Sequence, residues 1–200
     1  MLLSSCPFSR GISFELKENM ARLLYLIGMM GAGKTTAGRI LAERTGWRFI
    51  DMDREIERES GRTIPEIFRE QGEGAFREME TNLLRRLSTE EGCIVSTGGG
   101  VVLAEENRRM LAGSGLVVYL RVSAQDVLER TRGDTGRPNL VAEDRRARIE
   151  SLIEQRQPLY CATAEVSFKS AGGSPGSLVS RILAHPKVKA LFSGAEPRHS

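Results

Sequence analysis

The sequence has few cysteines and no long hydrophobic run. Its three cysteines, Cys6, Cys93 and Cys161, are widely spaced and form neither a CxxC pair nor a Cys/His cluster, which argues against a zinc site. Such usage is typical of free thiols in a reducing cytoplasm. No apolar run approaches the roughly 20 residues that span a bilayer. Residues 1–19 lack the basic start and apolar stretch of a signal peptide. We therefore predict a cytoplasmic protein that does not enter a membrane.

A strong excess of either charge is also missing. The 200 residues include 29 basic and 26 acidic side chains, which gives a formal net charge of +3. So small an excess does not predict a nucleic-acid binder, although it is compatible with a cleft that collects phosphates and carboxylates. The hydrophobic share of 40% is that of an ordinary globular protein, and the length suffices for one α/β domain with its own core.

Apolar runs and helical stretches alternate along the chain. Strands are expected at 23–27, 47–50, 93–96, 116–120 and 166–168, and helices at 34–44, 53–59, 64–71, 74–89, 105–111, 124–130, 144–157 and 175–183. This alternation predicts an α/β fold in three layers, with helices on both faces of a central five-stranded parallel sheet. We expect one domain over 20–184, an extension over 1–19, and a frayed tail over 185–200.

A phosphate-binding motif follows the first expected strand. Gly28–Thr35 reads GMMGAGKT and fits G-x-x-x-x-G-K-[ST] between an apolar strand and a helix. Its glycines let successive N–H groups turn toward phosphate oxygens, while Lys34 can reach the β and γ phosphates and Thr35 can ligate Mg²⁺. The nucleotide-binding residues expected here are Gly31, Ala32, Gly33, Lys34, Thr35 and Thr36. The alternative is a glycine-rich turn that binds nothing.

The motif predicts a P-loop NTPase-type sandwich without fixing its class. The sequence has no Asn-Lys-x-Asp segment of the kind that reads guanine and no strand followed by Asp-x-x-Gly. At this length there is little room for the extra domains of a motor. These absences favour a small-molecule kinase that uses ATP.

Two aspartates follow the second expected strand, at the sheet edge where open parallel sheets bind ligands. Asp51 and Asp53 could face Mg²⁺ and a hydroxyl substrate, and Asp53 could accept or orient the proton of the attacking hydroxyl. The alternative for Asp53 is a helix N-cap, a common role of aspartate. The two roles are compatible.

Two further segments extend this edge. Arg77 and Glu80 lie three residues apart and share one face of a helix, and an arginine fork matches the two oxygens of a carboxylate. The alternative is a solvated ion pair. The run Gly98–Gly100 directly follows the third strand, where bare backbone would let a ligand lie close. Its alternative is a plain tight turn.

Taken together, these segments resemble the shikimate kinase family over residues 23–183. The resemblance rests on the order and spacing of GAGKTT at 31–36, DMD at 51–53, FREME at 76–80, STGGG at 96–100, Arg-Pro at 137–138 and RQPLY at 156–160. It implies Mg²⁺-dependent transfer of the γ-phosphoryl group of ATP to the 3-hydroxyl of shikimate. ATP and shikimate are then the expected partners of a chain that acts as a monomer.

The resemblance also implies roles for single residues. Asp53, Arg77, Gly99 and Arg156 would contact shikimate, with Arg77 and Arg156 on its carboxylate and Glu80 holding Arg77. Asp51 would support Mg²⁺ beside Thr35, Arg130 would pack near adenine, and Arg137 would be a lid arginine over the phosphates. Lys34, Asp53 and Arg137 would be catalytic. Two departures concern the lid, where Asn139 replaces a usual leucine, and the adenine side, where 169–173 does not match.

Two other functions remain open at this point. One is a kinase for another small metabolite, such as gluconate or a nucleoside monophosphate, because pocket arginines can also grip a phosphate. The other is a nucleotide-binding regulator that transfers no phosphate. ADP release with and without shikimate distinguishes all three.

Overall fold

The computed structural model describes residues 23–132 and 144–193, in which five strands form one parallel sheet. The strands are β1 (Leu23–Ile27), β2 (Arg48–Asp51), β3 (Cys93–Ser96), β4 (Leu116–Arg121) and β5 (Val166–Lys169). Their order is β2-β3-β1-β4-β5, so the strand that enters the phosphate loop lies at the centre. In the register, Leu24 of β1 pairs with Ile94 of β3 on one side and with Leu116 of β4 on the other.

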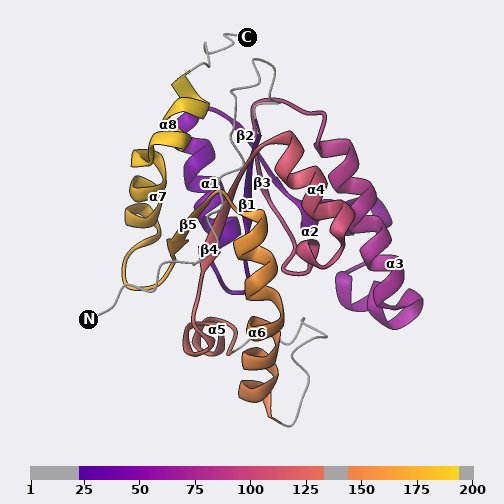
Figure 1. The fold of residues 1–200 in the computed structure, drawn as a ribbon. Helices are drawn as coiled ribbons and strands as arrows, with labels where there is room; N and C mark the ends of the chain where they lie inside the picture. The colour runs from indigo at the N-terminus through magenta and orange to yellow at the C-terminus, as the bar shows by residue number, and fades with distance from the viewer. Residues whose placement is uncertain (1–22, 133–143, 194–200) are drawn as a thin grey trace.

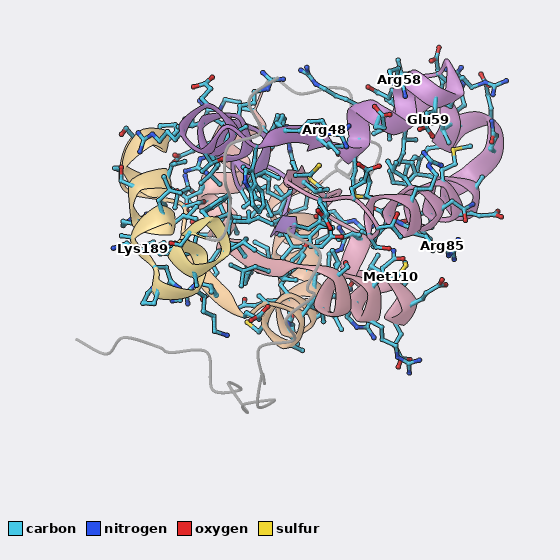
Figure 2. The ribbon with its side chains drawn as sticks, turned by 90° about the horizontal axis from the view of Figure 1, so that it is seen from above. Arg48, Arg58, Glu59, Arg85, Met110 and Lys189 are labelled. Carbon is cyan, nitrogen blue, oxygen red and sulfur yellow. The ribbon has the colours of Figure 1, made fainter. Side chains whose placement is uncertain are left out.

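Helices cover both faces of this sheet (Figure 1). They are α1 (Lys34–Thr45), α2 (Met52–Ser60), α3 (Ile64–Leu87), α4 (Glu105–Ser114), α5 (Ala124–Arg130), α6 (Arg145–Thr163), α7 (Pro175–Ala184) and α8 (Pro186–Ser193), with a short 3₁₀ turn η1 (Val101–Leu103). In Figure 2 the helix that carries Lys189 and the helix that carries Arg85 lie on opposite sides of the molecule. The predicted three-layer sandwich is confirmed.

Strand β1 shows why the layers form. Side chains alternate between the two faces of a strand, and every residue of β1 is fully buried. Leu23, Tyr25 and Ile27 belong to the core beneath α2, α3, α4 and α6, whereas Leu24 and Leu26 belong to the core beneath α1, α7 and α8. A continuous apolar run is therefore the pattern of a strand covered on both faces.

Local signals set several helix ends as predicted. Thr63 and Glu66 form the expected capping box at the start of α3, and Ser123 caps α5. The two helices expected at 64–71 and 74–89 are both parts of α3, which kinks at Gly72 with φ 83° and ψ 170°. A glycine tolerates that left-handed φ, so the chain turns there and resumes a helix.

Two expectations from the sequence are wrong. The chain from 185 onward does not fray at once, because Pro186–Ser193 forms α8. Val188 of this helix is fully buried and Phe192 packs edge-on against Trp47 at 4.5 Å, so distant contacts rather than local pattern hold it.

The other correction concerns a cysteine. Cys93 is a buried free thiol, as expected, but Cys161 is disulfide-bonded. Spacing along a chain does not reveal which cysteines lie within bonding distance. Residues 1–19 lie outside the described part of the chain. Within that part, every helix is too short or too polar to cross a bilayer.

Candidate active site

The phosphate loop leaves β1 at its carboxyl end and enters α1. Gly28, Gly31 and Gly33 have φ values of 142°, 72° and 84°, which only glycine adopts without strain. A Cβ on Gly28 would also lie 2.5 Å from the carbonyl oxygen of Leu120. Lys34 is only 8% exposed, and its Nζ donates to the carbonyl oxygens of Gly28 and Met29 at 2.8 and 3.0 Å. The glycines and the lysine thus fold the loop into a compact turn around one ammonium group.

A cavity of about 320 Å³ opens on this loop. Its lining consists of Met30, Gly31, Gly33, Lys34, Thr35, Thr36, Asp53, Ser96, Thr97 and Arg130. Five of the six predicted nucleotide residues are among them. The sixth, Ala32, is fully buried, and its N–H donates to the carbonyl of Met29 at 3.1 Å. The cavity therefore joins the phosphate loop to a carboxylate from α2 and a guanidinium from α5.

The two aspartates after β2 have different roles. Asp51 ends the strand and is the N-cap of α2, with its Oδ1 accepting from the N–H of Arg54. Its Oδ2 accepts from the Thr35 hydroxyl at 2.7 Å. Asp53 is therefore not the N-cap, and that alternative is wrong. Its side chain lines the cavity instead.

Oxygen donors at Thr35 and Asp51 fit a hard cation. Mg²⁺ prefers hydroxyl, carboxylate, phosphate and water oxygens, and the Thr35–Asp51 hydrogen bond joins a carboxylate to a hydroxyl-bearing residue that lines the cavity. No group of three or more His, Cys, Asp or Glu side chains in the described ranges is arranged so that it could hold a metal ion. Mg²⁺ at this position would therefore depend on phosphate and water oxygens as well.

Arg77 and Glu80 form a buried ion pair on α3. The Nη1 of Arg77 lies 2.7 Å from Oε2 of Glu80, whose side chain is 0% exposed, so the solvated ion pair of the alternative reading is wrong. Glu73 takes the other side of the guanidinium, with its Oε1 accepting from Nε and Nη2 at 3.2 and 3.0 Å. The contact with Glu73 was not predicted from the sequence. It could have been, because Glu73 lies four residues before Arg77 and residues at this spacing are neighbours on a helix.

Electrostatics at this pair follow from its burial. Desolvation raises the pKa of the Glu80 carboxyl above its usual range, although Arg77 and Arg156 oppose this shift. Burial also works against the charged form of Arg77, but Glu80 and Glu73 outweigh it and raise the pKa of the guanidinium. Arg77 thus stays charged, and its two carboxylate partners hold the guanidinium in one orientation. The other oxygen of Glu80, Oε1, is buried without a hydrogen-bond partner among the described residues.

The three glycines after β3 are needed for space rather than for backbone angle. None of them has a positive φ. A Cβ on Gly98 would lie 2.4 Å from Oε1 of Glu80 and 3.0 Å from Oδ1 of Asp53. A Cβ on Gly100 would lie 2.3 to 2.4 Å from three atoms of the Arg77 guanidinium. The run therefore lets charged side chains approach bare backbone, and a plain tight turn does not account for it.

The middle glycine is contacted from α6. Arg156 is 5% exposed, and its Nη1 donates to the carbonyl of Gly99 at 3.2 Å. The hydroxyl of Tyr160 donates to the same carbonyl. Tyr160 entered the sequence analysis only as part of a motif, without a role. On its other side Gly99 lies against the phosphate loop, since a Cβ there would be 3.4 Å from the N atom of Met30.

These contacts bring the two groups of predicted residues together. Gly98 lies beside both Asp53 of the cavity and Glu80, the partner of Arg77. Arg130 closes the other end, donating from Nη1 to the carbonyl of Gly31 at 2.9 Å and from Nη2 to the carbonyl of Ser170 at 3.1 Å. Ser170, Ser96 and Thr97 belong to segments named from the sequence, but no role was predicted for any of them. Arg137 lies outside the described residues.

Comparisons with known proteins agree on one family. The family model described as "Shikimate kinase" matches residues 30–187. A shikimate kinase from Aromatoleum aromaticum is 48% identical over 160 residues, which cover 80% of this chain and 91% of that protein. Another, from Methylococcus capsulatus, is 47% identical over 162 residues, covering 81% and 90%.

Solved structures give the same result. A shikimate kinase from Acinetobacter baumannii, in complex with shikimate, superposes with a TM-score of 0.81 at 39% identity, covering 88% of this chain and 96% of that one. The shikimate kinase from Aquifex aeolicus gives 0.73 at 33% identity, with 85% and 99% covered. A deoxyadenosine kinase from M. mycoides, at 0.53 and 14% identity with 84% and 99% covered, is similar in fold alone.

Proposed function

The chain belongs to the shikimate kinase family, and from that premise we infer that its sheet-edge cavity transfers the γ-phosphoryl group of ATP to the 3-hydroxyl of shikimate. The enzyme is an ATP-dependent phosphotransferase with an alcohol acceptor, and its products are ADP and shikimate 3-phosphate. The observation that carries the residue assignment is the meeting of Arg77, Gly99 and Arg156 beside a cavity that already holds Lys34 and Asp53.

The nucleotide binds on the phosphate loop. Residues at the start of α1 line the cavity together with Gly31 and Gly33, so the triphosphate would meet the positive end of a helix and the ammonium group of Lys34. Arg130 lies at the outer end of the loop and contacts the adenosine part. Thr35 and Asp51 would hold Mg²⁺, which would neutralise charge on the phosphate oxygens.

Shikimate binds on the other side of Asp53. Arg77 and Arg156 are two largely buried guanidinium groups at one loop, and together they take the carboxylate of the acceptor. The Gly99 backbone and Asp53 then meet ring hydroxyls. Glu80 orients Arg77 from beneath. This arrangement selects an acceptor that carries an anion at one end and a hydroxyl at the other.

The protein contributes position and charge to the transfer. Asp53 orients the attacking hydroxyl and accepts its proton, while Lys34 stabilises charge on the phosphoryl oxygens. Arg137 lies outside the described residues, and we propose that its guanidinium meets the negative charge of the transferring phosphoryl group. An arginine that meets transition-state charge contributes on the order of 10³–10⁵ in rate in comparable systems.

Measuring ADP release with several acceptors tests this function against its rivals. We expect release with shikimate and only background release with gluconate, a nucleoside monophosphate or no acceptor. A kinase for another metabolite would respond to one of those instead, and a regulator would bind ATP without releasing ADP. Either result would overturn the proposal.

Two further proposals concern the state of the enzyme. We propose that it acts as a monomer, and light scattering during a gel-filtration run would test this. We also propose a cytoplasmic location, where ATP is plentiful. Cell fractionation followed by the ADP-release assay tests that location.

A further inference from the structure

We propose that the hydroxyl of Tyr160 is a positioning group that holds the acceptor loop, Gly98–Gly100, in register with the phosphate loop, Gly28–Thr35. The inference rests on the proposed function, since it assigns to Tyr160 a part in how shikimate is presented to the nucleotide. Tyr160 is not itself expected to touch either substrate.

The first support is the hydrogen-bond pattern at the Gly99 carbonyl. This oxygen accepts from the Tyr160 hydroxyl at 2.5 Å and from Nη1 of Arg156 at 3.2 Å, which occupies both of its lone pairs. The two donors are four residues apart on α6 and so share one face of the helix. One helix face therefore fixes the orientation of the peptide that carries Gly99.

The second support is the contact between the two loops. A Cβ on Gly99 would lie 3.4 Å from the N atom of Met30 and 3.7 Å from the carbonyl oxygen of Gly28, so the loops meet backbone to backbone. The Tyr160 oxygen also lies 3.6 Å from the sulfur of Met29. A single hydroxyl thus contacts both loops.

The third support is the rigidity of the ring that carries the hydroxyl. Tyr160 is fully buried and stacks on Tyr119 of β4, with ring centroids 4.9 Å apart and planes 24° apart. Burial raises the pKa of the Tyr160 phenol well above its ordinary value, so the group remains a donor at neutral pH. The hydroxyl is therefore a donor in a fixed position, on a ring that packs against strand β4 of the central sheet.

Tyr160→Phe tests the proposal with little change in packing. The ring and its stacking partner remain, and only the donor to the Gly99 carbonyl is lost. We expect the KM for shikimate to rise roughly 3- to 10-fold, the size of one lost hydrogen bond in a buried site, while the Kd for ADP changes less than about twofold. If Tyr160 had a purely structural role, the variant would have a lower Tm, but its shikimate KM and its ADP Kd would change to a similar extent.

Tyr119→Phe is the matched control. It removes the hydroxyl of the tyrosine that stacks on Tyr160. Within the described ranges that hydroxyl makes no hydrogen bond, and the change leaves the contacts of Gly99 in place. We expect wild-type KM values from it. If Tyr160→Phe matches this control in shikimate KM, the positioning role is wrong.

Gly99→Val keeps the test decisive should Tyr160→Phe fold poorly. A Cβ at this position is already in van der Waals contact with Met30, Gly28 and Arg156 at 3.4 to 3.8 Å, so the two methyl groups beyond it would press the loops apart while Tyr160 stays intact. We expect a raised shikimate KM with an ADP Kd near wild type, and unchanged kinetics would contradict a register between the loops. Wild-type enzyme that releases no ADP with shikimate would instead defeat the proposed function, so the two failures are distinct.

Discussion

Replacing Glu80 by glutamine separates what this buried carboxylate does for folding from what it does for the acceptor site. Glu80 is 0% exposed, one of its oxygens has no hydrogen-bond partner among the described residues, and burial raises its pKa. A raised folded-state pKa means that the stability contributed by this group is present below the ordinary glutamate pKa. That stability is lost as the pH rises through the raised value.

The size of the effect follows from the contacts of the pair. Arg77 keeps Glu73 and is 21% exposed, so its charge is not stranded when Glu80 is neutralised. Each pKa unit by which burial raises the Glu80 carboxyl corresponds to roughly 1 kcal/mol between its two protonation states, and replacing the carboxylate by a neutral amide removes that cost at pH 8. In a chain of this length each kcal/mol shifts Tm by roughly 2–4 °C. We expect the variant to be more stable than wild type at pH 8 and the difference to shrink toward pH 4.5.

The same change should weaken the site. Without the 2.7 Å ion pair, Glu73 is the one carboxylate still bound to the Arg77 guanidinium among the described residues, and we expect shikimate KM to rise roughly 10-fold or more. Thermal melts from pH 4.5 to 8 and steady-state kinetics measure the two effects. A variant that is less stable than wild type at pH 8, or one whose stability follows pH as wild type does, would refute the reasoning.

Three other substitutions give separate tests. Gly100→Ala should displace the Arg77 guanidinium and raise shikimate KM 10-fold or more, whereas Gly113→Ala, whose Cβ meets nothing within 4 Å, should leave kinetics unchanged; equal kinetics in the two would contradict the close approach. Arg137→Ala should lower kcat by 10²-fold or more with little change in shikimate Kd, and an unchanged kcat removes it from the mechanism. Thr35→Val should raise the Mg²⁺ concentration for half-maximal activity about 10-fold, measured by Mg²⁺ titration at fixed ATP, and an unshifted titration would show that the hydroxyl does not support the metal.

Much of the fold was predictable because its signals are local. Fully buried strands show as apolar runs, as in Leu23–Ile27, and helix starts show as caps, as at Thr63 and Ser123. Helix α8 was missed because it is held by Val188 and by the contact of Phe192 with a tryptophan far away in the chain. No local pattern reports such a contact.

The site shows the same division. Its motifs predicted which residues gather at the sheet edge, because parallel strands end together. They did not predict that the ion pair between Arg77 and Glu80 is buried. They also did not predict that Asp51, and not Asp53, is the N-cap of α2. They also left Tyr160 without a role, since its hydroxyl acts on a backbone carbonyl 61 residues away in the chain.

A crystal structure of the enzyme with shikimate and ADP tests the central claim most directly. The distance to measure runs from the shikimate carboxylate to the guanidinium groups of Arg77 and Arg156. We predict hydrogen-bond distances to both, with a ring hydroxyl facing Asp53 toward the phosphate loop. A carboxylate bound elsewhere, with both arginines in contact with protein groups alone, would contradict the account.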